Sequence, residues 1–219
     1  VADGVGGHAK GEVASAQAVE EAYGFVCGGR SSIDAFLKRP SRETFFAVRR
    51  LVESAVQAAC YMVFGMGELD PNRKGMSTTI SVLMIVDRIA LMAQVGDSRV
   101  YRMREGVAQQ LTEDHTLLNY KLKHGLITPE EAAQAPGKNV ITRAVGHRDY
   151  VQVDTVEAGV RGGDRFLLCS DGLHTYLRDE EVAGMLAGDR LERVARRLVD
   201  LANDRGGRDN ITALLVDAH

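Results

Sequence analysis

The sequence contains few cysteines and prolines, three and four among 219 residues, and it contains no tryptophan. Cys27, Cys60 and Cys169 lie far apart and form no Cys-x-x-Cys pair. This spacing argues against a disulfide framework or a thiolate zinc site and favours three core thiols in a reducing compartment. No apolar run approaches the roughly 18 residues of a membrane-spanning helix. The start of the chain also lacks a signal-peptide pattern, so we expect a cytoplasmic protein without membrane insertion.

An excess of basic charge is missing as well. Lys and Arg number 27 and Asp and Glu number 30, which gives a formal net charge of -3. Nucleic-acid-binding domains usually carry a basic face, so we expect no nucleic-acid partner. The hydrophobic fraction of 45% and the charged fraction of 26% are ordinary for a globular protein, and the length fits one domain over residues 1–219.

Amphipathic spacing predicts helices at about 10–23, 114–125, 129–134, 179–186 and 190–202, together with a long helix after Ser41. A Gly-Gly-Arg-Ser-Ser loop is expected after the first helix, and Ser41 is the expected N-cap of the long one. Thr44 stands where Glu or Gln would complete a capping box, so we expect the box to be incomplete. Gly65, Gly67 and Pro71 are expected to end the long helix.

Runs rich in β-branched residues fill the middle of the chain. We expect a strand end at 1–3 and strands at 80–86, 89–95, 100–104, 107–111, 151–157, 165–169 and 211–216. Asp87-Arg88 and Glu105-Gly106 are hairpin-turn signals, which favour an antiparallel sheet. The sequence therefore predicts an α+β fold with helices packed on sheets.

Three aspartates stand at the ends of expected strands. Asp3 and Asp171 are each followed by glycine, and Asp209 follows a Gly-Gly pair and precedes the last strand. A buried, ionised aspartate is costly unless it is paired with a cation or bound to a metal. Three carboxylates without neighbouring His or Cys suit a hard divalent ion such as Mg²⁺ or Mn²⁺. Each aspartate alone is more often an ordinary turn or N-cap residue, and only their joint occurrence favours a metal site.

Seven short segments occur in an order that is typical of one family. They are VADGVGGH at 1–8, GMSTT at 75–79, QVGDSRVY at 94–101, LTEDH at 111–115, ITRAVG at 141–146, LLCSDGL at 167–173 and GGRDNIT at 206–212. With these motifs the chain resembles the metal-dependent serine/threonine phosphatases of the PPM (type 2C) family in their bacterial form. The resemblance covers nearly the whole sequence.

The resemblance implies an αββα sandwich, in which two mainly antiparallel sheets are flanked by helices. It implies two ions, Mn²⁺ or Mg²⁺, with Asp3 bridging both, Gly4 offering its carbonyl, and Asp171 and Asp209 completing the shell. Asp114 resembles a residue that helps to hold a third, weaker ion. The implied reaction is hydrolysis of phosphoserine and phosphothreonine by direct attack of a metal-bound water. The expected partners are phosphorylated proteins, the substrates of a serine/threonine kinase, and the expected oligomeric state is a monomer.

The chain departs from the family pattern in three places. It begins at the Asp-Gly motif, so we expect it to lack the first N-terminal strands, which carry a phosphate-binding Arg and an acidic pair, and to be weakly active. Val5 stands where eukaryotic members often place a His as general acid, and His8 is not its equivalent. Thr175 stands where bacterial members often have Asp, which implies that a third ion binds weakly or not at all.

The other motifs have ordinary interpretations. The segment Gly96–Arg99 predicts a tight turn capped by Asp97, and Thr78–Thr79 predicts local backbone hydrogen bonds behind the site. Arg143 is expected to tie strands together. The segment 116–139 resembles the flap beside the family's active site.

Two other functions are open on sequence grounds. The pattern Gly4-x-Gly6-x-x-Ala9, with an acidic residue at Glu20–Glu21, fits a dinucleotide-binding fingerprint, although the expected hairpins argue against the parallel sheet that it needs. A phosphatase-like fold that serves as a non-catalytic binding or regulatory module is the second. Thr175 and the expected lack of upstream strands favour it, and the three aspartates oppose it.

Overall fold

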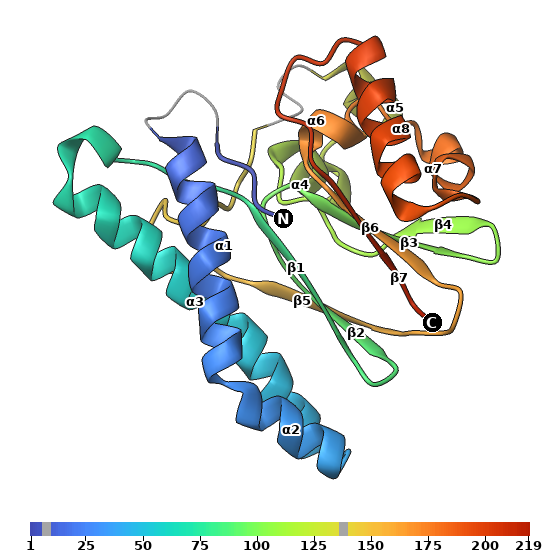
Figure 1. The fold of residues 1–219 in the computed structure, drawn as a ribbon. Coiled ribbons are helices and arrows are strands. Elements are labelled where there is room, and N and C mark those ends of the chain that lie inside the picture. The colour runs from blue at the N-terminus through green and yellow to red at the C-terminus, as the bar shows by residue number, and fades with distance from the viewer. Residues whose placement is uncertain (6–9, 136–139) are drawn as a thin grey trace.

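The fold consists of two antiparallel sheets that lie between two groups of helices (Figure 1). The computed structural model describes residues 1–5, 10–135 and 140–219. The first sheet has the order β1-β2-β5 and the second the order β4-β3-β6-β7. Their strands are β1 (Ile80–Val86), β2 (Ile89–Val95), β3 (Arg99–Arg104), β4 (Val107–Gln110), β5 (Asp154–Gly159), β6 (Arg165–Cys169) and β7 (Ala213–Asp217). This architecture confirms the expected α+β sandwich.

Helices cover the outer face of each sheet (Figure 1). On the first sheet these are α1 (Gly11–Gly28), α2 (Arg30–Lys38) and α3 (Arg42–Leu69), and on the second α6 (Asp171–His174), α7 (Asp179–Leu186) and α8 (Leu191–Asp204). The helices α4 (Leu117–Lys123) and α5 (Pro129–Gln134) lie in the connection between β4 and β5, and a 3₁₀ turn lies at Pro71–Arg73. Val52 and Leu91 belong to the core between α1–α3 and the first sheet. Leu167 and Leu198 belong to the core beneath α6–α8, and Met92 lies between the sheets. Three apolar layers therefore hold the four layers of secondary structure together.

The helical regions differ from the sequence expectation at two points. The Gly-Gly-Arg-Ser-Ser segment is not a loop, because α2 begins at Arg30 and packs Phe36 against Phe45 of α3 with 5.5 Å between ring centroids. The long helix α3 also continues through Gly65 and Gly67. A glycine costs a helix only about 1 kcal/mol relative to alanine, so the packing of α3 on the sheet outweighs both.

Ser41 caps α3 as expected, but the capping box is complete. The backbone N–H of Thr44 donates to Ser41 Oγ at 3.1 Å, and the backbone N–H of Ser41 donates to Thr44 Oγ1 at 3.0 Å. A threonine hydroxyl therefore takes the place of the usual carboxylate or amide oxygen.

The expected strands are found, with shifts of up to three residues at their ends. The strands β1, β2 and β6 have the expected bounds, whereas β5 begins at Asp154 and the expected helix at 114–125 begins at Leu117. The short helix α6 has no counterpart among the expected elements. Cys60 and Cys169 are buried thiols, but Cys27 is exposed, so the expectation of three core thiols is wrong for Cys27. None of the helices in the described ranges is long and apolar enough to span a bilayer.

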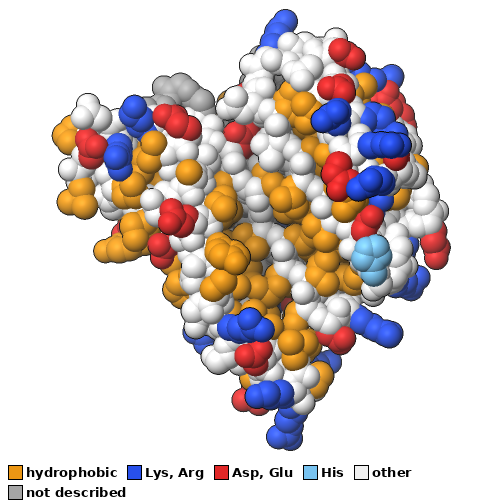
Figure 2. All heavy atoms as spheres, viewed as in Figure 1, with side chains coloured by type: hydrophobic (Ala, Val, Ile, Leu, Met, Phe, Trp, Pro, Cys, Tyr) orange, Lys and Arg blue, Asp and Glu red, His pale blue; other side chains and the backbone are white. Residues whose placement is uncertain are grey.

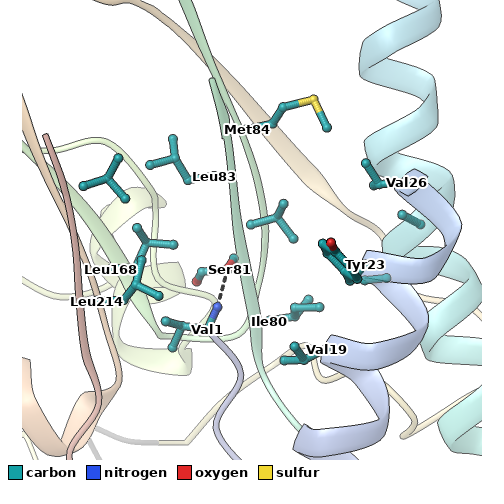
Figure 3. Close-up of a pocket in the computed structure, with 14 residues that line it drawn as sticks. Val1, Val19, Tyr23, Val26, Ile80, Ser81, Leu83, Met84, Leu168 and Leu214 are labelled. Carbon is teal, nitrogen blue, oxygen red and sulfur yellow. Dashed lines mark hydrogen bonds between the residues drawn. The ribbon is translucent and has the colours of Figure 1, made fainter. Parts of the chain in front are cut away.

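The strands β1 and β7 are the edges of their sheets, and a cavity of about 320 Å³ is lined by both. We call it the apolar cavity; its lining is Val1, Val19, Ala22, Tyr23, Val26, Ala55, Ile80, Ser81, Val82, Leu83, Met84, Leu168, Leu214 and Val216. Figure 3 shows Val19 and Tyr23 of α1 on one side of β1 and Leu168 and Leu214 on the other. Hydrophobic side chains gather at the centre of the same face in Figure 2.

The N-terminal residues pair with the start of β1, as expected for a strand end. The nitrogen of Val1 donates to the carbonyl of Ser81 at 2.9 Å, and Ser81 N–H donates back to the carbonyl of Val1 at 2.8 Å (Figure 3). This exchange is the hydrogen-bonded pair of an antiparallel ladder. The expectation that the first N-terminal strands of the family are lacking stays a prediction.

Candidate functional site

The three aspartates singled out in the sequence meet in one pocket of about 200 Å³. We call it the acidic pocket; its lining is Asp3, Gly4, Val5, Thr79, Asp97, Ile141, Asp171 and Asp209. Thr79 precedes β1, Asp97 lies between β2 and β3, Asp171 follows β6, and Asp209 precedes β7. The N-terminal segment that pairs with the start of β1 contributes residues 3–5, and the connection before β5 contributes Ile141. Because neighbouring strands of an antiparallel sheet run in opposite directions, the end of one strand lies beside the start of the next. Residues far apart in the sequence therefore converge at the same end of the two sheets.

The backbone of Asp3 is fixed by two threonines. The backbone N–H of Asp3 donates to Thr79 Oγ1 at 3.0 Å, and Thr79 N–H donates to the carbonyl of Asp3 at 2.8 Å. Thr78 Oγ1 donates to the same carbonyl at 2.8 Å. Both threonines therefore make the local hydrogen bonds behind the site that the sequence predicted, and they hold the aspartate against the start of β1.

Asp171 is the first residue of α6, directly after β6. The preceding Ser170 Oγ donates to the carbonyl of Asn210 at 3.0 Å and accepts from the backbone N–H of Thr212 at 3.1 Å. These two bonds tie the end of β6 to the segment that carries Asp209. One serine therefore sets the relative position of two of the aspartates.

Gly172 makes the close approach of those segments possible. A Cβ at this position would lie 2.3 Å from the carbonyl oxygen of Asn210 and 3.4 Å from Asp209 Cβ. The first distance is far below contact, so a side chain here would push the two segments apart. The glycine of the SDGL motif is required for backbone proximity.

Asp97 is a site residue that the sequence interpretation missed. The turn expected at Gly96–Arg99 is present, but the carboxyl group of Asp97 lines the acidic pocket. Gly96 has a φ of +101°, and a Cβ there would lie 2.5 Å from Thr79 Cγ2, so glycine is needed on both counts. The available signal was the position of Asp97 just after an apolar strand, which it shares with Asp3 and Asp171.

The carboxylates of the acidic pocket are crowded. Burial, the charge of Asp171 and a hydrogen bond with it raise the pKa of Asp3 to about 7. Burial and the charges of Asp171 and Asp114 raise the pKa of Asp97 to about 7. Within residues 1–5, 10–135 and 140–219, no Lys, Arg or His nitrogen lies within 4.0 Å of a carboxylate oxygen that lines this pocket. The pocket therefore concentrates negative charge without a protein cation to offset it.

The donor set of the acidic pocket fits a hard divalent cation. Four carboxylates and the backbone carbonyl of Gly4 are available, and oxygen ligands of this kind suit Mg²⁺ and Mn²⁺. In the part of the chain that the structure describes, no three His, Cys, Asp or Glu side chains are already grouped as a metal shell. The assignment of Asp3, Gly4, Asp171 and Asp209 as ligands stays a prediction.

Asp114, which the resemblance connects with a third ion, does not line the acidic pocket. Its carboxylate accepts hydrogen bonds from Arg99 Nε at 3.0 Å and Nη2 at 2.7 Å, and from Gln110 Nε2 at 3.0 Å. This partly buried ion pair already offsets its charge. Among the described residues Asp97 is better placed than Asp114 to add a further carboxylate, and the role of Asp114 at a third ion stays a prediction.

The other residues considered in the sequence have varied positions. Val5 lines the acidic pocket, and Thr175 is exposed at the end of α6. Gly6, His8 and Ala9 lie outside the described residues, so the structure does not test the role of His8. The antiparallel pairing of both sheets contradicts the dinucleotide-binding alternative, which requires a parallel sheet.

Arg143 lies outside the acidic pocket, in the connection before β5, and it bonds to one strand instead of tying two strands together as expected. Its Nη1 donates to Asp154 Oδ1 of β5 at 2.6 Å, and Asp154 Oδ2 lies 3.1 Å from His115 Nε2. Burial opposes ionisation of Asp154, but the hydrogen bonds from Arg143 and His115 lower its pKa below the usual value. Beside this cluster, the segment after the expected flap contributes Ile141 to the wall of the pocket.

Comparisons with known proteins agree with this geometry. The sequence model of the family described as Protein phosphatase 2C matches residues 1–216. Protein phosphatase PhpP of Streptococcus pneumoniae is 37% identical over 217 residues, which cover 99% of this chain and 83% of that protein. The crystal structure of the Mycobacterium tuberculosis serine/threonine phosphatase PstP/Ppp has a TM-score of 0.83 and 32% identity, and the match covers 100% of this chain and 86% of that one.

A second similar structure contains metal. It is described as the catalytic domain of the serine threonine protein phosphatase PstP in complex with two manganese ions. Its TM-score is 0.76 and its identity 33%, over 99% of this chain and 85% of that chain.

Proposed function

The chain belongs to the protein phosphatase 2C family of serine/threonine phosphatases, and from this membership we propose that it hydrolyses phosphoserine and phosphothreonine in proteins. The observation that carries the proposal is the acidic pocket, which is lined by four aspartates from separate segments of the chain. Such a pocket suits divalent cations and, through them, a phosphoryl group. We also propose that residues 1–219 act as one catalytic domain, with kinase substrates as partners.

Two divalent cations, Mn²⁺ or Mg²⁺, would be held by Asp3, Asp171 and Asp209 together with the carbonyl of Gly4. When bound, they supply the Lewis acidity that lowers the pKa of an attacking water and offsets charge on the phosphoryl oxygens. The two manganese ions in the structure of the similar PstP catalytic domain support a pair of divalent cations as the cofactor here. Asp97 adds a fourth carboxylate at the same pocket.

The protein prepares the site by fixing the backbones of its acidic residues. The threonine hydroxyls hold Asp3, and Ser170 links the segments of Asp171 and Asp209. Groups that are already in place lose little conformational freedom on binding, which favours affinity. Val5 and Ile141 complete the wall with hydrocarbon, which suits contact with the carbon atoms of a phosphorylated side chain.

On sequence grounds the leaving hydroxyl obtains its proton from water or from elsewhere, because Val5 stands where eukaryotic members often place a general acid. The described lining of the acidic pocket contains no His, Lys, Tyr or Cys. Burial and the charge of Arg99 lower the pKa of His174 to about 4, and its Nε2 already donates to the carbonyl of Asp97 at 3.0 Å. No described imidazole is therefore placed as a general acid.

Hydrolysis of a phosphothreonine peptide with Mn²⁺ tests the proposal. We expect phosphate release that stops on addition of EDTA, returns with excess Mn²⁺, and is abolished by Asp171→Asn or Asp209→Asn. Asp200→Asn on α8 is the matched control, because Asp200 is exposed and does not line the acidic pocket. Metal-independent release, or full activity of the Asp171 and Asp209 variants, would contradict the mechanism. The rate also tests the expected weak activity.

A non-catalytic binding module is the alternative. The exposed Thr175 in place of an acidic residue favours it, and the four crowded carboxylates oppose it. The two functions differ in one measurement. Mn²⁺ binding without hydrolysis of any phosphopeptide would favour the binding module, whereas hydrolysis that requires Mn²⁺ supports the enzyme.

A further inference from the structure

The backbone of the loop Gly96–Ser98 is held by three side chains, of which Gln94 and His115 are buried and His174 is partly buried. The first is Gln94 at the end of β2, which is 1% exposed. Its Nε2 donates to the carbonyl of Gly96 at 3.1 Å and to the carbonyl of Ser98 at 2.5 Å, on either side of Asp97. Its Oε1 accepts from Ser81 Oγ of β1 at 2.5 Å, so the amide is itself fixed.

The second is His115, from the LTEDH motif. The backbone N–H of Gly96 donates to His115 Nδ1 at 3.2 Å, so Nδ1 carries no proton and the proton of a neutral imidazole is on Nε2. That Nε2 lies 3.1 Å from Asp154 Oδ2, which can only accept. Arg143 in turn fixes Asp154 at 2.6 Å. The imidazole is therefore oriented from both sides.

The third is His174, the last residue of α6. Its Nε2 lies 3.0 Å from the carbonyl oxygen of Asp97, and because a carbonyl only accepts, the imidazole donates. The helix that starts with Asp171 thus ends with a bond to the backbone of Asp97. Two aspartates of the acidic pocket are linked through four residues of one short helix.

We propose that His174, together with His115 and Gln94, is a positioning residue that sets the direction in which the carboxylate of Asp97 enters the acidic pocket. This proposal depends on the proposed function in one respect, namely that Asp97 acts on a cation or phosphoryl group bound in the acidic pocket. The three side chains bond the backbone amide of Gly96 and the carbonyls of Gly96, Asp97 and Ser98. Such a cradle leaves the loop little freedom to rotate Asp97 away from the pocket.

Two substitutions at His174 separate positioning from packing. His174→Leu fills similar space but has no donor, whereas His174→Gln retains an N–H at a similar reach. We measure Mn²⁺ binding by titration calorimetry and hydrolysis of a phosphothreonine peptide. His174→Leu is expected to weaken Mn²⁺ binding or lower kcat by about 10-fold, as outer supports of metal ligands typically do, and His174→Gln is expected to restore most of the loss.

A double-mutant cycle shows whether His174 acts through Asp97. If it does, His174→Leu causes little further loss in an Asp97→Asn background, because the carboxylate that it positions is gone. A purely structural role would give losses that add. Leu198→Ala, a buried change in α8 away from the acidic pocket, is the control for general destabilisation. His124→Leu, at an exposed position directly after α4, is the control for loss of an imidazole.

Full Mn²⁺ binding and full activity of His174→Leu overturn the positioning role, and so does a loss that adds completely to that of Asp97→Asn. A protein that binds Mn²⁺ but hydrolyses no phosphopeptide contradicts the proposed function instead. In that case the Mn²⁺ affinities of the same variants still decide the positioning role.

Discussion

The acidic pocket and the apolar cavity are neighbours that share a segment of chain but differ in chemistry. Thr79 lines the acidic pocket, and the next residue, Ile80, lines the apolar cavity. The same change occurs between Asp3 and Val1, which pair with this segment. The boundary between the two environments is therefore only one or two residues wide.

The comparison shows that volume does not identify a functional site. The apolar cavity, at about 320 Å³, is larger than the acidic pocket, at about 200 Å³. Its lining contains two hydroxyl groups, those of Tyr23 and Ser81, and no charged side chain. Removal of a residue in the cavity should therefore change stability, and removal of a carboxylate in the pocket should change activity. Each of the following predictions tests that division.

The largest expected effect is on catalysis in the acidic pocket. Asp171→Asn keeps the size of the side chain but removes a charge that would hold a cation. We expect kcat with Mn²⁺ to fall by about 1,000-fold, equivalent to about 4 kcal/mol of transition-state stabilisation. Steady-state hydrolysis measures the loss, and circular dichroism checks the fold. Unchanged kcat would break the assignment of function to this pocket.

The converse effect is expected in the apolar cavity. Leu168 is buried between the sheets and lines the cavity, so Leu168→Ala should lower the free energy of unfolding by roughly 3 kcal/mol. Urea unfolding measures the change. The kcat per folded molecule should remain that of the wild type below the transition. A large loss of kcat without a loss of stability would show that the apolar cavity affects catalysis in the acidic pocket.

A smaller and opposite change in stability is expected for Asp3→Asn without metal. Because the folded protein raises the pKa of Asp3 to about 7, it holds more protons than the unfolded chain from the usual aspartate pKa up to that value. Ionisation as the pH rises through this window therefore lowers the stability of the wild type. In EDTA, thermal unfolding should show the variant to be more stable at about pH 8 and little different near pH 4. A variant less stable than the wild type at high pH would contradict the crowding of charge.

The smallest expected effect is a gain from filling the apolar cavity. Val82→Ile adds one methylene to its lining, and burial of that group is worth up to about 0.8 kcal/mol. Thermal unfolding should show a slightly raised Tm, with kcat unchanged. A lowered Tm would mean that Val82 has no room for the added group.

The sequence predicted the strands and the gathering of Asp3, Asp171 and Asp209 because both have local signals. Alternation and hairpin turns mark the strands, and each aspartate stands next to glycine at a strand end. The helix α2 was not predicted, since Gly-Gly-Arg-Ser-Ser has the composition of a loop. Only the packing of Phe36 against Phe45, a contact between two helices, explains its formation.

Asp97 and Asp114 show why the rest of the site was beyond sequence reasoning. Asp97 follows an apolar strand and Asp114 follows the polar pair Thr112–Glu113, but neither pattern shows which carboxylate lines the acidic pocket. The difference lies in their tertiary contacts. The carboxylate of Asp114 accepts hydrogen bonds from Arg99, whereas the side chain of His174 bonds to the backbone of Asp97, whose carboxyl group lines the pocket. The pairing of a carboxylate depends on tertiary structure, which spacing does not encode.

Gly172 sets the distance between the segments that carry Asp171 and Asp209. The gap between the backbone after β6 and the carbonyl of Asn210 leaves no space for a methyl group. Gly172→Ala would alter no charge and remove no ligand, yet it would change the separation of Asp171 and Asp209. Mutagenesis of the polar residues alone would test each metal-ligand candidate separately and would miss the role of Gly172. The smallest residue at the site thus determines a dimension that none of the acidic residues sets alone.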